Sequence, residues 1–282
     1  MQETIHYITR ELKDLYPPGE IRQFVRLILH ALRGYSLTEM IVKSGELFSA
    51  GERSRVSTIV ARLKMQEPIQ HILEQTLFHG LDLKVNPAVL IPRPETEELV
   101  DWIIREYSHP PLRILDIGTG SGCIALALKK AFNTPLTEAC DISEKALTLA
   151  QENASENHLD IRFFKADILQ WEKCTQWNSY DLIVSNPPYV TLKEKKLMPA
   201  NVTDFEPWSA LFVPDEEPLL FYRHIAVFAN RHLQNNGSLF LEINEKAGSE
   251  IRELLMQNGF NTPEIRNDMQ GKPRMVKAVR NY

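Results

Sequence analysis

Hydrophobic residues in the first 76 positions recur every three or four residues, which is the spacing of amphipathic helices. The first helix is predicted to carry its apolar face on Ile5, Ile8, Leu12 and Leu15. The Pro-Pro-Gly sequence at 17–19 ends this segment, and a second helix is predicted over 20–33 with Gly34 as its C-cap. Ser36 and Glu39 have the spacing of a capping box that begins a third helix, and a fourth is predicted over 52–65. We therefore predict a small helical bundle over residues 1–76.

The pattern changes to a two-residue alternation in "LDLKV", residues 81–85, where every second residue is apolar. This period is typical of a half-buried strand. Asn86 and Pro87 would then turn the chain, and residues 88–91 would return as a second strand. We predict a β-hairpin over 77–92 that links the helical bundle to a second domain over 93–282.

From residue 93 onward, strand patterns alternate with helix patterns. Seven strands are predicted, in the segments "LRILDIG", "LTEACDI", "IRFFKAD", "YDLIVSN", "GSLFLEI", "TPEIRND" and "RMVKAVR". Because helices separate most of these strands, the units are parallel βαβ units, and we predict an α/β fold with a doubly wound, mostly parallel, Rossmann-like sheet. Such sheets bind their ligands at the carboxyl ends of the strands, so the residues that follow each strand are the candidates for a site.

Composition and charge exclude several classes of protein. The 282 residues are 43% hydrophobic and 24% charged, which is ordinary for a chain with a packed core. The three cysteines form no Cys-x-x-Cys pair, so we expect reduced thiols and no metal site. The first residues have no apolar signal core and no run is long enough to span a membrane, so we expect a cytoplasmic protein. Residues 81–282 carry 22 Lys and Arg against 28 Asp and Glu, which counts against a protein that wraps duplex DNA.

Glycine recurs at every second position in the loop after the first predicted strand of the second domain. In "LDIGTGSGC", residues 115–123, Cys123 stands where a dinucleotide-binding loop would have its third glycine. A glycine loop lets the backbone approach a ligand closely and presents N–H groups at a helix N-terminus. We predict that this loop binds a cofactor through Gly118, Thr119, Gly120, Ser121 and Gly122.

Two acidic residues follow the next two strands. Asp141 could accept both hydroxyls of a ribose, and Asp167 could accept the adenine amine, with Ile168 packed on the ring. Taken singly, each aspartate could equally be a cap or a turn residue. Together with the glycine loop, they favour a cationic adenosine ligand, S-adenosylmethionine, over a nicotinamide cofactor with its pyrophosphate.

A rigid turn, Asn186-Pro187-Pro188-Tyr189, follows the fourth strand of this domain, which should lie beside the first. Proline lacks an N–H and has a fixed φ, so the Pro187 carbonyl is left to accept a hydrogen bond, and Asn186 offers an amide oxygen as a second acceptor. Two acceptors at a fixed separation match the –NH₂ of an amide or an aromatic amine, on which Tyr189 would stack. We predict that Asn186, Pro187 and Tyr189 are catalytic, that all four residues bind the substrate, and that Asn186 also borders the cofactor. Asn186 would align the nitrogen and stabilise its growing charge, because an amide is not a general base.

At this point the chain resembles the HemK/PrmC-type protein-(glutamine) methyltransferases, which modify peptide chain release factors. The resemblance spans nearly the whole chain and is carried by "LIPRPETEELV" at 90–100, "EPWSAL" at 206–211 and the set Asp268, Gly271 and Arg274, together with the two motifs above. It implies a class I methyltransferase domain that transfers a methyl group from S-adenosylmethionine to the glutamine nitrogen of a Gly-Gly-Gln motif, leaving S-adenosylhomocysteine. It also implies that 118–122 and Asp141 bind the cofactor and that 186–189 hold the glutamine.

The segment "IPRPETEE" has a structural interpretation and a functional one. Pro92 and Pro94 would stiffen the entry to a helix, and Thr96 would cap it. Arg93 and Glu95 could also border the methyl site.

Two other functions stay open. The same turn would serve a nucleic-acid amino methyltransferase, with Tyr189 stacked on a flipped base. A scaffold that binds the cofactor and grips a partner through its helical bundle is the non-enzymatic alternative. We expect a monomer whose partner is a release factor, with no membrane contact and no direct nucleic-acid partner.

Overall fold

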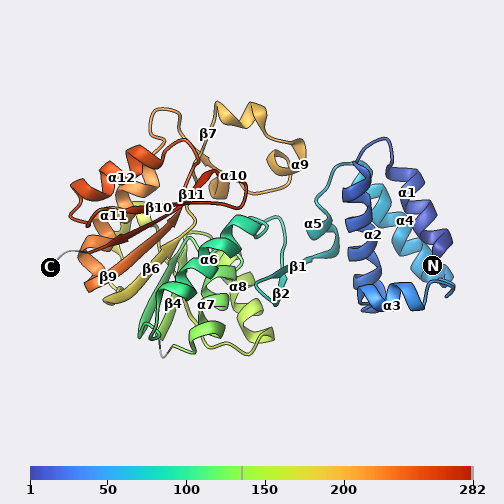
Figure 1. The fold of residues 1–282 in the computed structure, drawn as a ribbon, viewed down its shortest axis with the longest axis horizontal. Helices are drawn as coiled ribbons and strands as arrows, with labels where there is room; N and C mark the ends of the chain where they lie inside the picture. The colour runs from blue at the N-terminus through green and yellow to red at the C-terminus, as the bar shows by residue number, and fades with distance from the viewer. Residues whose placement is uncertain (135, 281–282) are drawn as a thin grey trace. The chain divides into compact units, whose positions relative to one another are not determined.

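The structure is a computed structural model that describes residues 1–134 and 136–280. Contacts between Cα atoms divide the chain into two compact units: 1–74 with 199–205, and 75–198 with 206–282. Figure 1 traces the chain through both units and labels most of their elements. Within the described ranges, none of the helices is both long and apolar enough to cross a membrane.

The first unit is helical. Its helices are α1 (Gln2–Leu12), α2 (Pro18–Arg33), α3 (Leu37–Val42), α4 (Ala50–Lys64), α5 (Ile69–Leu73) and the short α9 (Ala200–Thr203). Gly34 adopts φ +68° and its N–H donates to the carbonyl of His30, as the C-cap prediction requires. The capping box between Ser36 and Glu39 is also confirmed. The core of these helices is a single apolar cluster of residues such as Ile8, Leu29 and Leu63.

The hairpin lies in the second unit, one strand earlier than predicted. It pairs β1 (Gln75–Phe78) with β2 (Leu81–Lys84) in antiparallel register, so the prediction of a second strand over 88–91 is wrong. His79 and Gly80 both have positive φ, 48° and 70°, which is the geometry of a two-residue type I′ turn. This turn pairs β2 with the segment before it. Asn86 instead closes a local turn, because its Oδ1 accepts from the N–H of Ala88.

The main sheet of the second unit has seven strands in the order β10-β11-β9-β6-β3-β4-β5. Five neighbouring strands are parallel, and β11 pairs antiparallel with both β9 and β10, which confirms the mostly parallel α/β sheet. The strands are β3 (Arg113–Ile117), β4 (Leu136–Asp141), β5 (Arg162–Lys165), β6 (Tyr180–Ser185), β9 (Leu233–Glu242), β10 (Glu264–Asn267) and β11 (Pro273–Val279). The short strands β7 (Val190–Thr191) and β8 (Phe212–Val213) pair apart from this sheet.

Helices cover both faces of the seven-stranded sheet (Figure 1). One apolar cluster joins a face of the sheet to α6 (Pro94–Glu106), α7 (Cys123–Phe132) and α8 (Glu144–Glu156). The other joins the opposite face to α11 (Leu220–His232) and α12 (Gly248–Gln257). The 3₁₀ helices η1 (Ile168–Lys173) and η2 (Glu194–Leu197) and the short α10 (Trp208–Leu211) lie in the connections. Both layers bury continuous apolar surface, so the carboxyl ends of the central strands are held in fixed positions.

Candidate active site

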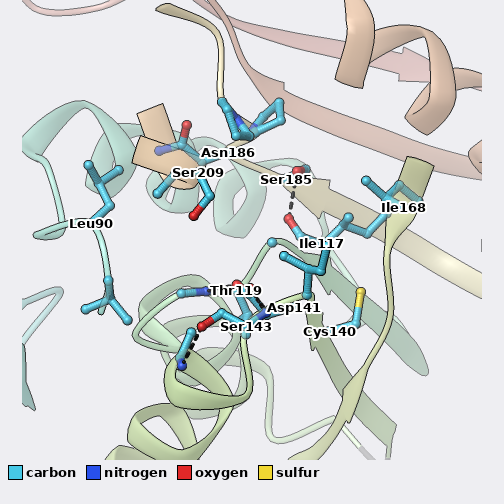
Figure 2. Close-up of a pocket in the computed structure, with 18 of the residues that line it drawn as sticks. Leu90, Ile117, Thr119, Cys140, Asp141, Ser143, Ile168, Ser185, Asn186 and Ser209 are labelled. Carbon is cyan, nitrogen blue, oxygen red and sulfur yellow. Dashed lines mark hydrogen bonds between the residues drawn. The ribbon is translucent and has the colours of Figure 1, made fainter. Parts of the chain in front are cut away.

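A cavity of about 290 Å³ lies at the carboxyl ends of the central parallel strands. Figure 2 shows its labelled residues, with Asn186 and Ser185 on one side and Thr119, Asp141 and Ser143 on the other. Among the predicted site residues, the cavity is lined by Gly118, Thr119, Gly120, Ser121, Asp141, Asp167, Ile168, Asn186, Pro187 and Pro188. Gly122 and Tyr189 are described but are not part of this lining. The structure therefore gathers residues from four separate strand ends.

The glycine loop joins β3 to α7 with positive φ at all three glycines. Gly118 and Gly120 have φ of 72° and 55°, and a Cβ atom added at either would meet no atom within 4 Å. Gly122 differs, because a Cβ there would lie 2.5 Å from Leu126 Cδ1 and 3.2 Å from the Cβ of Ala150. Gly122 is thus needed for the close packing of α7 on α8, while the first two glycines leave open backbone beside the cavity.

Asp116 lies beneath the glycine loop and is fully buried. Its Oδ2 accepts from Thr119 Oγ1 at 2.6 Å and from the N–H of Ala125 at 3.3 Å, while no described group donates to its Oδ1. Burial raises the pKa of Asp116 to about 7, against the opposing effect of these two hydrogen bonds. The carboxyl therefore ties the loop to the first turn of α7.

Asp141 ends β4 and reaches back to the glycine loop. Its Oδ2 accepts from the N–H of Gly120 and its Oδ1 from the N–H of Ser143, both at 2.9 Å. Burial raises its pKa, and the backbone hydrogen bonds oppose this. Each carboxylate oxygen has a further lone pair, so the group can still accept hydroxyl protons from a ligand in the cavity.

Asp167 is both a cap and a cavity residue. Its Oδ1 accepts from the N–H of Leu169 at 2.9 Å, which caps η1, and its Oδ2 accepts from Gln170 Nε2 at 3.1 Å. Apolar lining residues from the adjoining segments include Ile142, Ala166, Ile168, Leu169, Phe221 and Ile225. This end of the cavity suits a flat, mostly apolar group with a polar edge.

The Asn-Pro-Pro-Tyr turn begins where β6 ends, directly beside the glycine loop. Ser185 pairs with Ile117 in the register of β6 and β3, and Ser185 Oγ donates to the Ile117 carbonyl at 2.7 Å. Asn186 and Gly118 therefore leave the sheet side by side. Asn186 Nδ2 donates to Thr96 Oγ1 at 3.1 Å. Among the described residues, none donates to Asn186 Oδ1 or to the Pro187 carbonyl.

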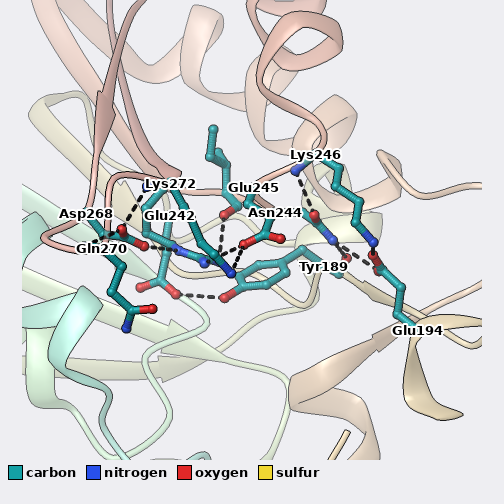
Figure 3. A network of polar contacts seen from close by, with 11 residues as sticks. Tyr189, Glu194, Glu242, Asn244, Glu245, Lys246, Asp268, Gln270 and Lys272 are labelled. Carbon is teal, nitrogen blue, oxygen red and sulfur yellow. Dashed lines mark hydrogen bonds and ion pairs between the residues drawn. The ribbon is translucent and has the colours of Figure 1, made fainter. Parts of the chain in front are cut away.

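Tyr189 is held by its polar atoms behind the turn. Its hydroxyl donates to Glu242 Oε1 at 2.9 Å, and its carbonyl accepts from Asn244 Nδ2 at 3.3 Å, as Figure 3 shows. Burial raises the pKa of Tyr189, and the neighbouring Glu242 adds to this effect, so the hydroxyl stays protonated. Its ring packs against the buried cluster on one face of the sheet. A stacking role for this ring on a substrate stays a prediction.

The prediction that Thr96 caps α6 is wrong. Arg93 occupies the N-cap position and Pro94 begins the helix, so Thr96 lies inside the first turn. Its hydroxyl donates instead to Glu242 Oε2 at 2.6 Å. Thr96 and Glu242 are 2% and 1% exposed. Sequence reasoning missed Glu242, although an acidic residue at the end of the apolar strand "GSLFLE" was a usable signal.

An ion pair between the buried Glu206 and the partly exposed Arg93 joins two of the sequence motifs at the cavity rim. Glu206 accepts from Arg93 Nη2 and from the N–H of Ile91, and burial raises the pKa of its carboxyl against the effect of Arg93. The neighbouring residues Leu90, Pro92, Pro207 and Ser209 line the cavity, whereas Arg93 and Glu95 do not. Arg93 therefore holds the rim together rather than facing the cavity.

The C-terminal motif supports the same region from the side of Tyr189 (Figure 3). Asp268 Oδ2 accepts from Arg274 Nε at 3.2 Å, and its Oδ1 accepts from the N–H groups of Gln270 and Lys272. Burial raises the pKa of Glu242, and the positive charge of Arg274 partly offsets this rise.

Across the described ranges, no cluster of three or more His, Cys, Asp or Glu is placed to hold a metal ion.

Comparisons with known proteins agree on both units. The family model described as Methyltransferase small domain matches residues 99–202, and that described as PrmC N-terminal domain matches residues 3–73. A release factor glutamine methyltransferase of Flavobacterium psychrophilum is 44% identical over 271 residues, which cover 95% of this chain and 94% of the relative. Its counterpart in Bacteroides thetaiotaomicron is 41% identical over 280 residues, covering 99% of this chain and 100% of the relative.

Solved structures share the fold. A methyltransferase from Pyrococcus furiosus superposes with a TM-score of 0.54 at 18% identity, covering 83% of this chain and 100% of that one. With the matched family model, this confirms the class I methyltransferase fold.

Proposed function

The chain belongs to the family of release factor glutamine methyltransferases, and on this premise we propose that it methylates the side-chain nitrogen of the glutamine in the Gly-Gly-Gln motif of peptide chain release factors. The observation that carries the proposal is the pairing of Ile117 with Ser185, which sets the glycine loop and the proline turn side by side. A methyl donor at the loop and an amide nitrogen at the turn would then be neighbours.

The methyl donor in this proposal is S-adenosylmethionine, which supplies an electrophilic methyl group on a positively charged sulfur and leaves as S-adenosylhomocysteine. The cavity fits it by charge and shape. Open backbone at Gly118 and Gly120 would accommodate its methionine part, and Asp141 would accept the ribose hydroxyls. The apolar end around Ile168 would take the adenine, with Asp167 at its polar edge.

The proline turn would hold the glutamine amide. Asn186 Oδ1 and the Pro187 carbonyl are the two acceptors that no described group occupies, and each would accept one N–H of the amide. The two prolines fix φ on either side of the second acceptor, so the pair is rigid before the substrate binds. Pro188 lines the cavity and would bound the amide.

These two acceptors would promote methyl transfer by orienting the amide nitrogen. An amide nitrogen is a weak nucleophile because its lone pair is delocalised into the carbonyl. Two hydrogen bonds that hold both N–H groups turn the remaining lone pair toward the methyl carbon. Orientation of this kind lowers a barrier by up to about 7–11 kcal/mol. As the nitrogen becomes positive, the same two oxygens stabilise it, and the surplus proton leaves to water because Asn186 is not a base.

The helical unit is proposed to contact the release factor. The support is its exposed apolar surface, because Leu37, Ile41, Val42 and Leu47 are each more than half exposed. A reaction on a translation factor would take place in the cytoplasm. A monomeric state stays a prediction.

The test is a labelling experiment. The enzyme is incubated with methyl-labelled S-adenosylmethionine and a purified bacterial release factor, and the label is mapped by mass spectrometry. We expect one methyl group on the Gly-Gly-Gln glutamine and none on ribosomal RNA or duplex DNA offered in parallel. An unlabelled glutamine would reject the proposal, and a labelled base would favour the nucleic-acid alternative instead.

A further inference from the structure

Four polar side chains from three distant segments form a continuous hydrogen-bonded chain that begins at the cavity wall, where Asn186 and Thr96 line the cavity, and continues behind it to Glu242 and Tyr189. Asn186 Nδ2 donates to Thr96 Oγ1 at 3.1 Å, and Thr96 Oγ1 donates to Glu242 Oε2 at 2.6 Å. The second oxygen of Glu242 accepts from the Tyr189 hydroxyl at 2.9 Å. Thr96 and Glu242 are almost fully buried, so water does not compete for these contacts.

The direction of each hydrogen bond follows from the protons available. Glu242 accepts from two hydroxyls, from Thr96 Oγ1 at 2.6 Å and from Tyr189 at 2.9 Å, so the single hydroxyl proton of Thr96 points to Glu242 Oε2. Only lone pairs of the Thr96 oxygen then face Asn186. A lone pair can receive the Nδ2 donor but repels the Oδ1 acceptor.

We propose, on the basis of the proposed function, that Thr96 and Glu242 are positioning residues that fix which way the Asn186 amide faces. With Nδ2 held by Thr96, Oδ1 is the atom left for the cavity. The opposite rotamer would place Oδ1 against the Thr96 oxygen and would present an –NH₂ to the –NH₂ of the substrate. Both contacts would then be repulsive, and the substrate nitrogen would lose one of its two acceptors.

Glu242 also fixes the far end of the same turn. Through Tyr189 it holds the last residue of the tetrapeptide, and through Thr96 it orients the first. The two prolines between them transmit this alignment because their φ angles are fixed. One buried carboxylate at the end of β9 thus sets the geometry of both substrate acceptors, although it does not line the cavity.

The test compares Thr96→Val, which keeps the shape and removes the hydroxyl, with Thr96→Ser, which restores it. In Thr96→Val the kcat for release factor methylation should fall by about 10- to 100-fold, as expected from misplacement of a substrate-aligning group. The Kd for S-adenosylmethionine, measured by calorimetry, should stay within about two-fold of wild type, since the cofactor side of the cavity is untouched. Thr96→Ser should recover most of the lost turnover.

The matched control is Thr137→Val. Thr137 is as buried as Thr96, at 2% exposure, but its hydroxyl has no hydrogen-bond partner among the described residues. Removal of the Thr137 hydroxyl should leave kcat and KM unchanged. A kcat of Thr96→Val equal to that of this control would overturn the inference. So would parallel losses of cofactor affinity, thermal stability and turnover in both Thr96 variants, since these indicate a merely structural role.

Two further measurements separate this inference from the proposed function. If Thr96 acts only through Asn186, Thr96→Val should cause no additional loss in an Asn186→Ala background, and a full additional loss would contradict it. The side-chain amide proton resonances of Asn186, identified by their disappearance in Asn186→Ala, should shift in Thr96→Val without any substrate present. Unshifted resonances would overturn the inference even if the glutamine is methylated. Shifted resonances together with an unlabelled glutamine would reject the proposed function, but they would still support the proposed orientation of the Asn186 amide by Thr96.

Discussion

The two sides of the cavity are built by different means. The glycine loop after β3 is shaped by backbone conformation, with positive φ at three glycines and two neighbouring N–H groups, those of Gly118 and Thr119, bonded to the Cys140 carbonyl. The proline turn after β6 is shaped by side chains that come from far along the sequence. Asn186 and Thr96 are separated by 90 positions, and Tyr189 and Glu242 by 53. The cofactor side therefore depends on two strand ends that follow each other in the sequence, with Gly120 and Asp141 21 positions apart, whereas the substrate side depends on side chains that only the assembled fold brings together.

The largest expected effect falls on the substrate side. Asn186→Ala removes one of the two proposed acceptors, and turnover should fall by about 10²–10³-fold, the loss seen when one preorganised hydrogen bond to a transition state is deleted. Cofactor affinity should survive, because the glycine loop and Asp141 are unchanged. Single-turnover kinetics and calorimetry measure the two quantities separately. Wild-type turnover in this variant would show that the turn does not align the nitrogen.

The next effect tests whether packing, as well as positive φ angles, requires glycine at position 122 of the loop. Gly122→Ala places a Cβ 2.5 Å from Leu126 Cδ1 on a residue with φ +85°, so overpacking and left-handed strain add. We expect the free energy of unfolding to fall by about 2–4 kcal/mol, measured by urea denaturation. Gly118→Ala is the matched control. It has the strain of φ +72° but open space around the new atom, so its loss should be no more than about 1–2 kcal/mol. Equal losses in the two variants would show that the packing of Leu126 and Ala150 around Gly122 is unimportant.

A smaller effect is expected for the ribose carboxylate on the cofactor side. Asp141→Ala removes the acceptor of the Gly120 and Ser143 N–H groups and the proposed partner of two hydroxyls. The Kd for S-adenosylmethionine should rise by about 10- to 100-fold, equivalent to one or two charge-assisted hydrogen bonds. At saturating cofactor, kcat should stay near the wild-type value. An unchanged Kd would remove the ribose assignment and leave Asp141 as a loop anchor alone.

The contrast between the two sides also explains which parts of the protein could be predicted from the sequence. The helical unit, the seven-stranded sheet and the strand-end positions of Asp141, Asp167 and Asn186 followed from periodicity, because these features depend on local pattern and on the topology of parallel sheets. The hairpin was misplaced because the turn at His79 and Gly80 carries only one glycine.

The hydrogen-bond partners of individual polar residues could not be predicted from the sequence. Threonine is a residue type that often caps helices, so the sequence suggested a cap at Thr96. Only the packing of α6 beside β9 makes the Thr96 hydroxyl the partner of Glu242. The pairing of Arg93 with Glu206, 113 positions apart, is likewise a product of the assembled fold. Long-range pairs of this kind have no period, so they leave no pattern in one sequence.

The smallest effect concerns Asp116, which supports the glycine loop from below. Its pKa in the folded protein is about 7, above the value of 3.8 for an unperturbed aspartate, because it is fully buried. Between these two values the folded state holds a proton that the unfolded state has released. Stability therefore falls as the pH rises toward 7 and stops falling once both states are ionised. Between pH 6 and pH 8, ionisation of Asp116 should lower the free energy of unfolding of the ligand-free enzyme by about 1 kcal/mol.

Asp116→Asn should abolish that part of the pH dependence. The asparagine oxygen can accept from Thr119 and Ala125 as the carboxyl does, and its –NH₂ takes the place of the oxygen that lacks a partner, so the variant mimics the protonated acid. The measurement is the free energy of unfolding in urea at pH 6, 7 and 8. The control is Asp160→Asn at an exposed position, which should keep the wild-type slope. If Asp116→Asn and wild type lose stability in parallel over this range, the buried carboxyl is not the group that titrates, and the glycine loop rests on an ionised Asp116 throughout.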